Sequence, residues 1–213
     1  MFGLFTAFNA DVVNDVTLYK AVVPARFGGR SSAILDILPK AGSVDKWGGD
    51  LMLSNYSGKL SLNGPLIKDK VSILGGFRLS YINWFLNSLS NPTVKNSQAN
   101  FYDGNLVISA PVSENNEFTY SYYTSYDDFA FASDTTISWK NTAHSLQWKS
   151  KLSSRLSLEA LATIRSMTTE SSTKVGSMIL KSSQEFRIWE ENFFWGIISM
   201  RPIKSSLGVN LSR

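Results

Sequence analysis

Val71 to Tyr81 reads VSILGGFRLSY, and its side chains alternate in character along the chain. Successive residues of a β-strand point to opposite faces of a sheet. One face of this stretch therefore carries Val71, Ile73, Gly75, Phe77, Leu79 and Tyr81, and the other carries Ser72, Leu74, Gly76, Arg78 and Ser80. The first face suits lipid and the second suits water. The stretch predicts a β-strand that separates an apolar phase from a polar one.

The same alternation recurs in three later stretches. Residues 102–112 place Tyr102, Leu106, Ile108, Ala110 and Val112 opposite Asp103, Asn105 and Ser109, and residues 118–126 and 156–164 repeat the pattern. Turn-rich segments separate these runs, which is typical of an all-β fold. We therefore expect nine strands, over residues 46–54, 57–65, 70–82, 101–112, 116–127, 139–151, 155–167, 183–199 and 206–213.

The links between these predicted strands alternate in length. Residues 66–70, 113–116 and 153–155 are short links, whereas 83–100, 127–138 and 167–182 are long ones. Short turns on one side and long loops on the other are typical of a bacterial outer-membrane β-barrel, and a soluble sandwich has no reason to keep that order. The pattern predicts a transmembrane antiparallel β-barrel. Nine is an odd number, and single-chain bacterial barrels have an even one, so we expect only part of a barrel.

Aromatic residues stand where such strands would leave a bilayer. Tyr81 ends one run and Tyr102 opens the next, on the proposed lipid face and beside the same long loop. A run from Val71 to Tyr81 rises about 33 Å along a strand, or roughly 25 Å in height at a tilt near 40°. Tyr81, Tyr102 and Tyr126 are therefore candidates for an outer aromatic girdle, although β-strands of any kind favour tyrosine. His144 does not fit, because the alternation places it on the lipid face.

Composition excludes several functions. The 213 residues include no cysteine and one histidine, so a disulfide framework, a thiolate metal site and a histidine cluster are absent from the sequence. The net charge of +4 is spread along the chain, which argues against nucleic-acid binding. The sequence contains no run of 18 apolar residues, so it predicts no transmembrane helix. No catalytic motif is present, so we expect neither an enzyme nor a bound cofactor.

Two motifs link the chain to a known family. Val16 to Ile37 reads VTLYKAVVPARFGGRSSAILDI, with PARFGGR at its centre, and Gly64 to Lys70 reads GPLIKDK. In this order the two motifs resemble TonB-dependent outer-membrane receptors. PARFGGR is similar to the segment near the end of the plug domain of these receptors, and GPLIKDK to the first periplasmic turn of their barrel.

The resemblance implies a division of the chain. Residues 1–42 would be the C-terminal part of the plug, and 43–213 the first strands of a barrel that has 22 strands in plugged transporters. Gly28 and Gly29 would allow the plug backbone to approach the wall closely. Arg26 and Arg30 flank them and would meet acidic groups on the inner wall, for which Asp103 and Glu159 are possible partners.

The family also implies a function. These receptors import a scarce, bulky ligand, such as an iron chelate, a cobalamin-like compound or an oligosaccharide. A periplasm-spanning protein supplies the energy through a segment that precedes the plug, and the expected location is the outer membrane of a Gram-negative bacterium. Residues 1–13 do not resemble a signal peptide, so we expect a fragment of a longer protein. A passive porin-type barrel and a soluble carbohydrate-binding β-sandwich are the alternatives.

Overall fold

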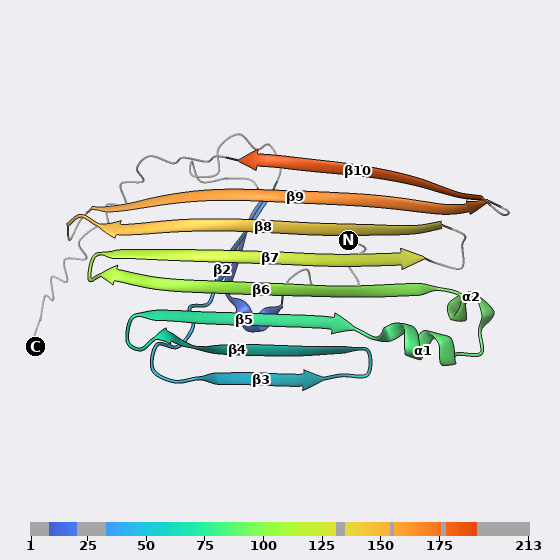
Figure 1. The fold of residues 1–213 in the computed structure, drawn as a ribbon, viewed down its shortest axis with the longest axis horizontal. Coiled ribbons are helices and arrows are strands. Elements are labelled where there is room, and N and C mark those ends of the chain that lie inside the picture. The colour runs from blue at the N-terminus through green and yellow to red at the C-terminus, as the bar shows by residue number, and fades with distance from the viewer. Residues whose placement is uncertain (1–8, 21–32, 131–134, 154–155, 176–177, 191–213) are drawn as a thin grey trace, which may run out of the picture.

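The computed structural model describes residues 9–20, 33–130, 135–153, 156–175 and 178–190. These residues form an all-β fold with antiparallel strands, as the alternation predicted (Figure 1). The described elements are η1 (Ala10–Val12), β1 (Val13–Tyr19), β2 (Ile34–Pro39), β3 (Gly48–Leu53), β4 (Ser57–Ile67), β5 (Val71–Ser80), α1 (Ile82–Ser88), α2 (Pro92–Lys95), β6 (Gln98–Ser113), β7 (Asn116–Ala130), β8 (Thr135–Lys151), β9 (Ser157–Val175) and β10 (Met178–Glu190).

Strands β3 to β10 form one eight-stranded sheet in which each strand pairs with its neighbour in sequence. Side chains therefore line up in rows across the sheet. One such row joins Lys59, Arg78, Asp103, Ser125 and Asn141, because each of these residues is the register partner of the next. Within the described residues the sheet is open, with β3 and β10 at its edges, rather than a closed barrel.

Two predicted long links are much shorter in the structure. β7 continues to Ala130 and β8 begins at Thr135, and β9 runs through to Val175 before β10 begins at Met178. The predictions of long loops over 127–138 and 167–182 were therefore wrong. In these two segments the side chains no longer alternate between apolar and polar. The strands still pair, because backbone hydrogen bonds do not depend on side-chain polarity. The predicted strand over 206–213 lies outside the described residues.

The long link after β5 contains the two short helices α1 and α2. Neither helix, nor any other in the described part of the chain, is long and apolar enough to cross a membrane. Asn83 fastens α1 to β6, since its side-chain oxygen accepts a hydrogen bond from the Ala99 amide at 2.8 Å and its amide donates to Asn100 Oδ1 at 2.6 Å.

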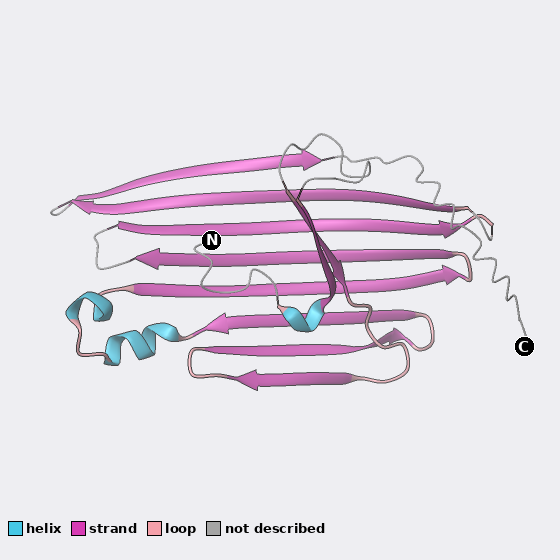
Figure 2. Ribbon diagram, turned by 180° about the vertical axis from the view of Figure 1, so that it is seen from behind, coloured by secondary structure: helices cyan, strands magenta, loops and turns pink. Residues whose placement is uncertain are grey.

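Strands β1 and β2 form a separate two-stranded sheet that crosses the large sheet on one face (Figure 2). The short helix η1, which precedes β1, contacts that face where Val12 packs with Leu74 of β5 and Val107 of β6. We call this the inner face, and the opposite one the outer face. Leu74 and Val107 are register partners, so Val12 fills a small apolar site within otherwise polar rows.

The chain between β2 and β3 also passes close to the backbone of β5. A β-carbon built on Gly42 would lie 2.3 Å from the backbone oxygen of Ile73, well inside any normal contact. Gly42 is therefore needed for the backbone to pass this closely over β5.

We expect Gly42→Ala to lower the free energy of unfolding by about 1–3 kcal/mol, because the backbone atom it meets cannot rotate away. Gly75→Ala on β5 is the matched control, since its nearest neighbour would be 3.9 Å away. Equilibrium urea titrations of both variants measure the difference. Equal losses in the two variants would show that close approach at Gly42 is not the cause.

Candidate functional site: the two faces of the large sheet

The inner face carries buried polar side chains. Ser61, Ser72, Ser109 and Ser125 are each less than 5% exposed, and all four share this face by register. Small hydroxyl side chains leave room for the β1–β2 sheet and η1, and they can hydrogen-bond locally when buried. The inner face is therefore polar and closely approached, which is unusual for the covered side of a soluble sheet.

A buried ion pair lies on this face. Arg78 Nε donates to Asp103 Oδ2 at 2.6 Å, with the side chains 14% and 3% exposed. The Arg78 guanidinium also lies 5.1 Å from the centre of the Phe101 ring, so it has an aromatic contact as well. The second carboxylate oxygen, Asp103 Oδ1, is buried without a hydrogen-bond partner among the described residues. Such a pair is costly to break from one side only.

Sequence reasoning offered Asp103 and Glu159 as possible partners of Arg26 and Arg30. In the described residues Asp103 pairs with Arg78 on the neighbouring strand. Glu159, the other proposed acidic partner, accepts a hydrogen bond from Gln147. Arg26, Gly28, Gly29 and Arg30 themselves lie outside the described residues.

The N-terminal segment has its own polar contacts with the inner face. Lys59 Nζ lies 2.8 Å from Asp11 Oδ2, with both side chains about one quarter exposed. The Asn9 side chain accepts a hydrogen bond from the Asp11 amide at 3.1 Å and caps η1. Gly76 lies beneath them, since a β-carbon there would come 2.7 Å from Val12 and 3.0 Å from Asn9. The contact is thus small, mixed in polarity and dependent on a glycine.

The outer face has the opposite character. Large apolar side chains project from it into open space, for example Leu62 (51% exposed), Phe77 (45%) and Leu146 (49%). Leu51, Leu53, Leu60, Leu79, Phe118 and Ile164 belong to the same face by register and are also exposed. The large sheet therefore buries serines and exposes leucines, the reverse of a soluble protein.

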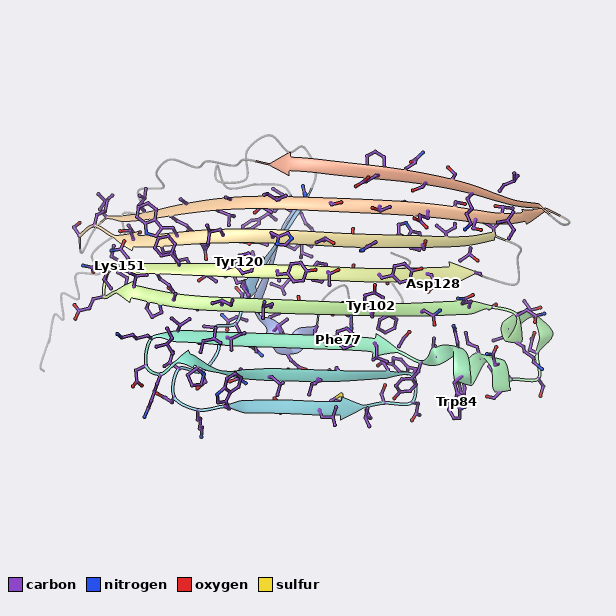
Figure 3. All side chains as sticks on the ribbon, viewed as in Figure 1. Phe77, Trp84, Tyr102, Tyr120, Asp128 and Lys151 are labelled. Atoms are coloured by element: carbon purple, nitrogen blue, oxygen red, sulfur yellow. The ribbon has the colours of Figure 1, made fainter. Side chains whose placement is uncertain are left out.

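Aromatic side chains gather at two levels of the outer face. Near the helical link, Tyr102 stacks on Tyr126 with ring centres 5.4 Å apart, and Phe77 lies 6.5 Å from Tyr102 (Figure 3). Tyr81, the third tyrosine predicted for this level, follows the end of β5, and its hydroxyl donates to the Ser57 carbonyl at 3.0 Å and to that of Ser54. It closes the β3–β4 turn rather than joining the stack.

A second aromatic level lies near the short turns. Phe118 stacks on Trp148 with ring centres 6.1 Å apart, and the Trp47 ring lies over Gly64 on the same face. This second level of Phe118 and Trp148 was not recognised from the sequence. The available signal was that Phe118 lies close to the short link 113–116, and Trp148 close to the short link 153–155.

Between these levels lies His144, on the face where the alternation placed it. It is exposed on the outer face, with Nδ1 2.8 Å from the Tyr120 hydroxyl and its ring 4.9 Å from the centre of Tyr122. The two tyrosines give the imidazole a hydrogen bond and an aromatic neighbour. A lone histidine with such partners is accommodated structurally.

Beyond Tyr102 and Tyr126 the outer face becomes polar. Asp128 Oδ2 accepts hydrogen bonds from Gln98 at 2.7 Å and Asn100 at 3.2 Å, and the register continues this row to Ser138 and Glu170. The change from stacked tyrosines in one row to a carboxylate in the next row marks an edge of the apolar part of the outer face.

No protein-family model, curated protein or solved structure matches this chain. The described residues also contain no group of three or more histidine, aspartate or glutamate side chains placed to hold a metal ion. The features that bear on function are the two faces of the sheet and the motifs that resemble TonB-dependent receptors.

We expect Arg78→Leu to lower the free energy of unfolding by about 3–5 kcal/mol, because it leaves the Asp103 carboxylate buried without a cation. The double variant Arg78→Leu/Asp103→Leu should recover much of that loss. Lys59→Gln is the control, and loss of its partly exposed pair should cost less than about 1 kcal/mol. A double-mutant cycle measured by urea unfolding gives the coupling energy between Arg78 and Asp103. Purely additive losses at the two positions would contradict the predicted coupling.

Proposed function

We propose that this chain is part of an outer-membrane receptor of the TonB-dependent kind and takes part in the energised uptake of a scarce, bulky ligand. The observation that carries the proposal is the inverted polarity of the large sheet. Its outer face exposes leucine, phenylalanine and tyrosine, while its inner face buries serine and an ion pair.

A bilayer accounts for the exposed apolar face. Exposed leucines in water would leave a large aggregation-prone patch, whereas hydrocarbon stabilises them. The distance between the two aromatic levels fits this interpretation. From Tyr102 to Ala110, the register partner of Phe118, a strand rises roughly 27 Å, or about 20 Å in height at a tilt near 40°. That height is close to the apolar band of about 25 Å known for outer-membrane barrels.

The inner contacts support a wall with a movable occupant. In the proposal, the β1–β2 sheet and η1 are the end of a plug and the large sheet is part of the barrel wall. Val12 is the apolar contact, and the Lys59–Asp11 ion pair is partly exposed to water. Partly exposed ion pairs contribute little stability, so a modest pulling force could separate this contact without unfolding the wall.

Ligand, partner and location come from the family resemblance. The receptor would capture an iron chelate, a cobalamin-like compound or an oligosaccharide, and a periplasm-spanning protein would pull on the plug from the periplasm. The open edges of the large sheet suit this proposal, because a 22-stranded barrel needs further strands to pair with β3 and β10. A passive porin lacks an occupant that could explain the β1–β2 sheet.

A single substitution distinguishes the bilayer from water around the outer face. Leu146→Arg should reduce the fraction of chain that floats with lipid vesicles, because an arginine inside the apolar band costs up to about 2–4 kcal/mol, the full cost applying at the bilayer midplane. Gln147→Arg, one residue further and on the inner face, is the matched control and should bind vesicles like the unchanged chain. If Leu146→Arg binds equally well, or the unchanged chain stays in the aqueous phase, a soluble sandwich is favoured instead.

The uptake role has its own test. Deleting the gene from its source bacterium should abolish high-affinity uptake of one ligand among iron chelates, cobalamin-like compounds and oligosaccharides, and a plasmid copy should restore it. The same loss is expected after dissipation of the proton gradient in the parent strain. Unchanged uptake of all three ligand classes would count against a receptor and leave the membrane location to be judged by the vesicle experiment.

A further inference from the structure

We propose that α1 is an interfacial anchor that lies in the headgroup layer of the outer leaflet, with Trp84 and Phe85 in contact with lipid. This inference rests on the proposed membrane function and extends it to a segment outside the strands. Trp84 is 73% exposed and Phe85 is 46% exposed, although both belong to one short helix of seven residues.

The helix is held in a defined place. At its start, the Tyr81 amide donates to the Tyr56 carbonyl at 2.9 Å, and the Tyr81 side chain reaches across to Ser57. At the next residue but one, Asn83 makes two hydrogen bonds to β6. Trp84 is exposed even though its helix is firmly attached to the neighbouring strands. It is presented outward from a fixed helix, on the side away from β6 (Figure 3).

The height of the helix follows from its partner on β6. Asn83 bonds to Asn100, which lies one row beyond the Tyr102–Tyr126 stack and shares Asp128 with Gln98. The stack ends the apolar band and the Asp128 row begins the polar zone. The helix α1 thus starts at the boundary between the two, where headgroups lie next to an outer-membrane barrel.

The composition of the helix suits that layer. Its sequence, INWFLNS, has no charge, and its exposed aromatic side chains are of the type that concentrates at membrane interfaces. A charged ligand or protein would find no complementary charge on it. The helix also continues from β5, whose outer side chains Phe77 and Leu79 are exposed on the proposed lipid face. Lipid is therefore the partner that extends an apolar surface already present.

The chain has no cysteine, so one introduced cysteine can be labelled uniquely with an environment-sensitive fluorophore. Three variants of the full chain are labelled separately: Trp84→Cys in α1, Leu146→Cys between the two aromatic levels of the outer face, and Ser90→Cys at an exposed position between the two helices. Each is bound to phosphatidylcholine–phosphatidylglycerol vesicles. Quenching is measured with headgroup spin-labelled lipid, with acyl-chain spin-labelled lipid and with aqueous iodide.

The expected result is that headgroup-labelled lipid quenches the probe at position 84 several-fold more than the probe at 90, while chain-labelled lipid quenches the probe at 146. Iodide-accessible probes at both 84 and 90, with 146 in lipid, would overturn the anchor but leave the membrane proposal intact. A probe at 84 shielded from lipid and iodide alike would mean that a protein or ligand covers it, which also overturns the anchor. A probe at 146 in water would overturn the membrane proposal itself.

The native side chain gives a second measurement that avoids labelling. Trp84→Phe should remove a blue-shifted component from the tryptophan emission of the vesicle-bound chain. This component is obtained by subtracting the spectrum of the variant from that of the unchanged chain. Removal of a red-shifted, water-exposed component would again contradict the anchor.

Discussion

The alternation of side chains across one sheet is the constraint on which the rest of this structure depends. In a strand the period is two, so each residue has only two possible faces. Along β5, one face receives Ile73, Phe77 and Leu79 and the other receives Ser72 and Arg78. A shift of one residue in any pairing would place Arg78 among leucines. The continuous register through eight strands therefore keeps the residues of each face together from one strand to the next.

This separation explains how a polar face can be buried at tolerable cost. Arg78 and Asp103 are register partners, so the carboxylate meets its cation without any rearrangement of the backbone. Serines nearby are small enough for η1 to approach, and Leu74 with Val107 gives Val12 an apolar contact. In the proposed receptor the same features would let the plug dock by a few contacts and leave again. A large apolar interface would hold it too firmly.

On the outer face, the strands continue beyond the point where the apolar band ends. Past Tyr102 and Tyr126, pairing continues for several rows, but the outward side chains become Asp128, Ser138 and Glu170. Strands that leave a bilayer can continue in water because their hydrogen bonds are already satisfied between neighbours. The proposed position of α1 at this level follows from the same boundary, since Asn83 bonds to the first polar row.

The sequence alone determined the strand class and which residues share a face, because period two is a local property that needs no partner. It also indicated that Tyr102 and His144 share the face of the apolar side chains. It could not determine where strands end, since backbone pairing beyond residue 127 continues without an apolar pattern. It could not pair Asp103 with Arg78 or place Trp47 over Gly64, because those contacts depend on the register between strands. Only the tertiary structure decided them, since register is set by the whole ladder of neighbouring strands.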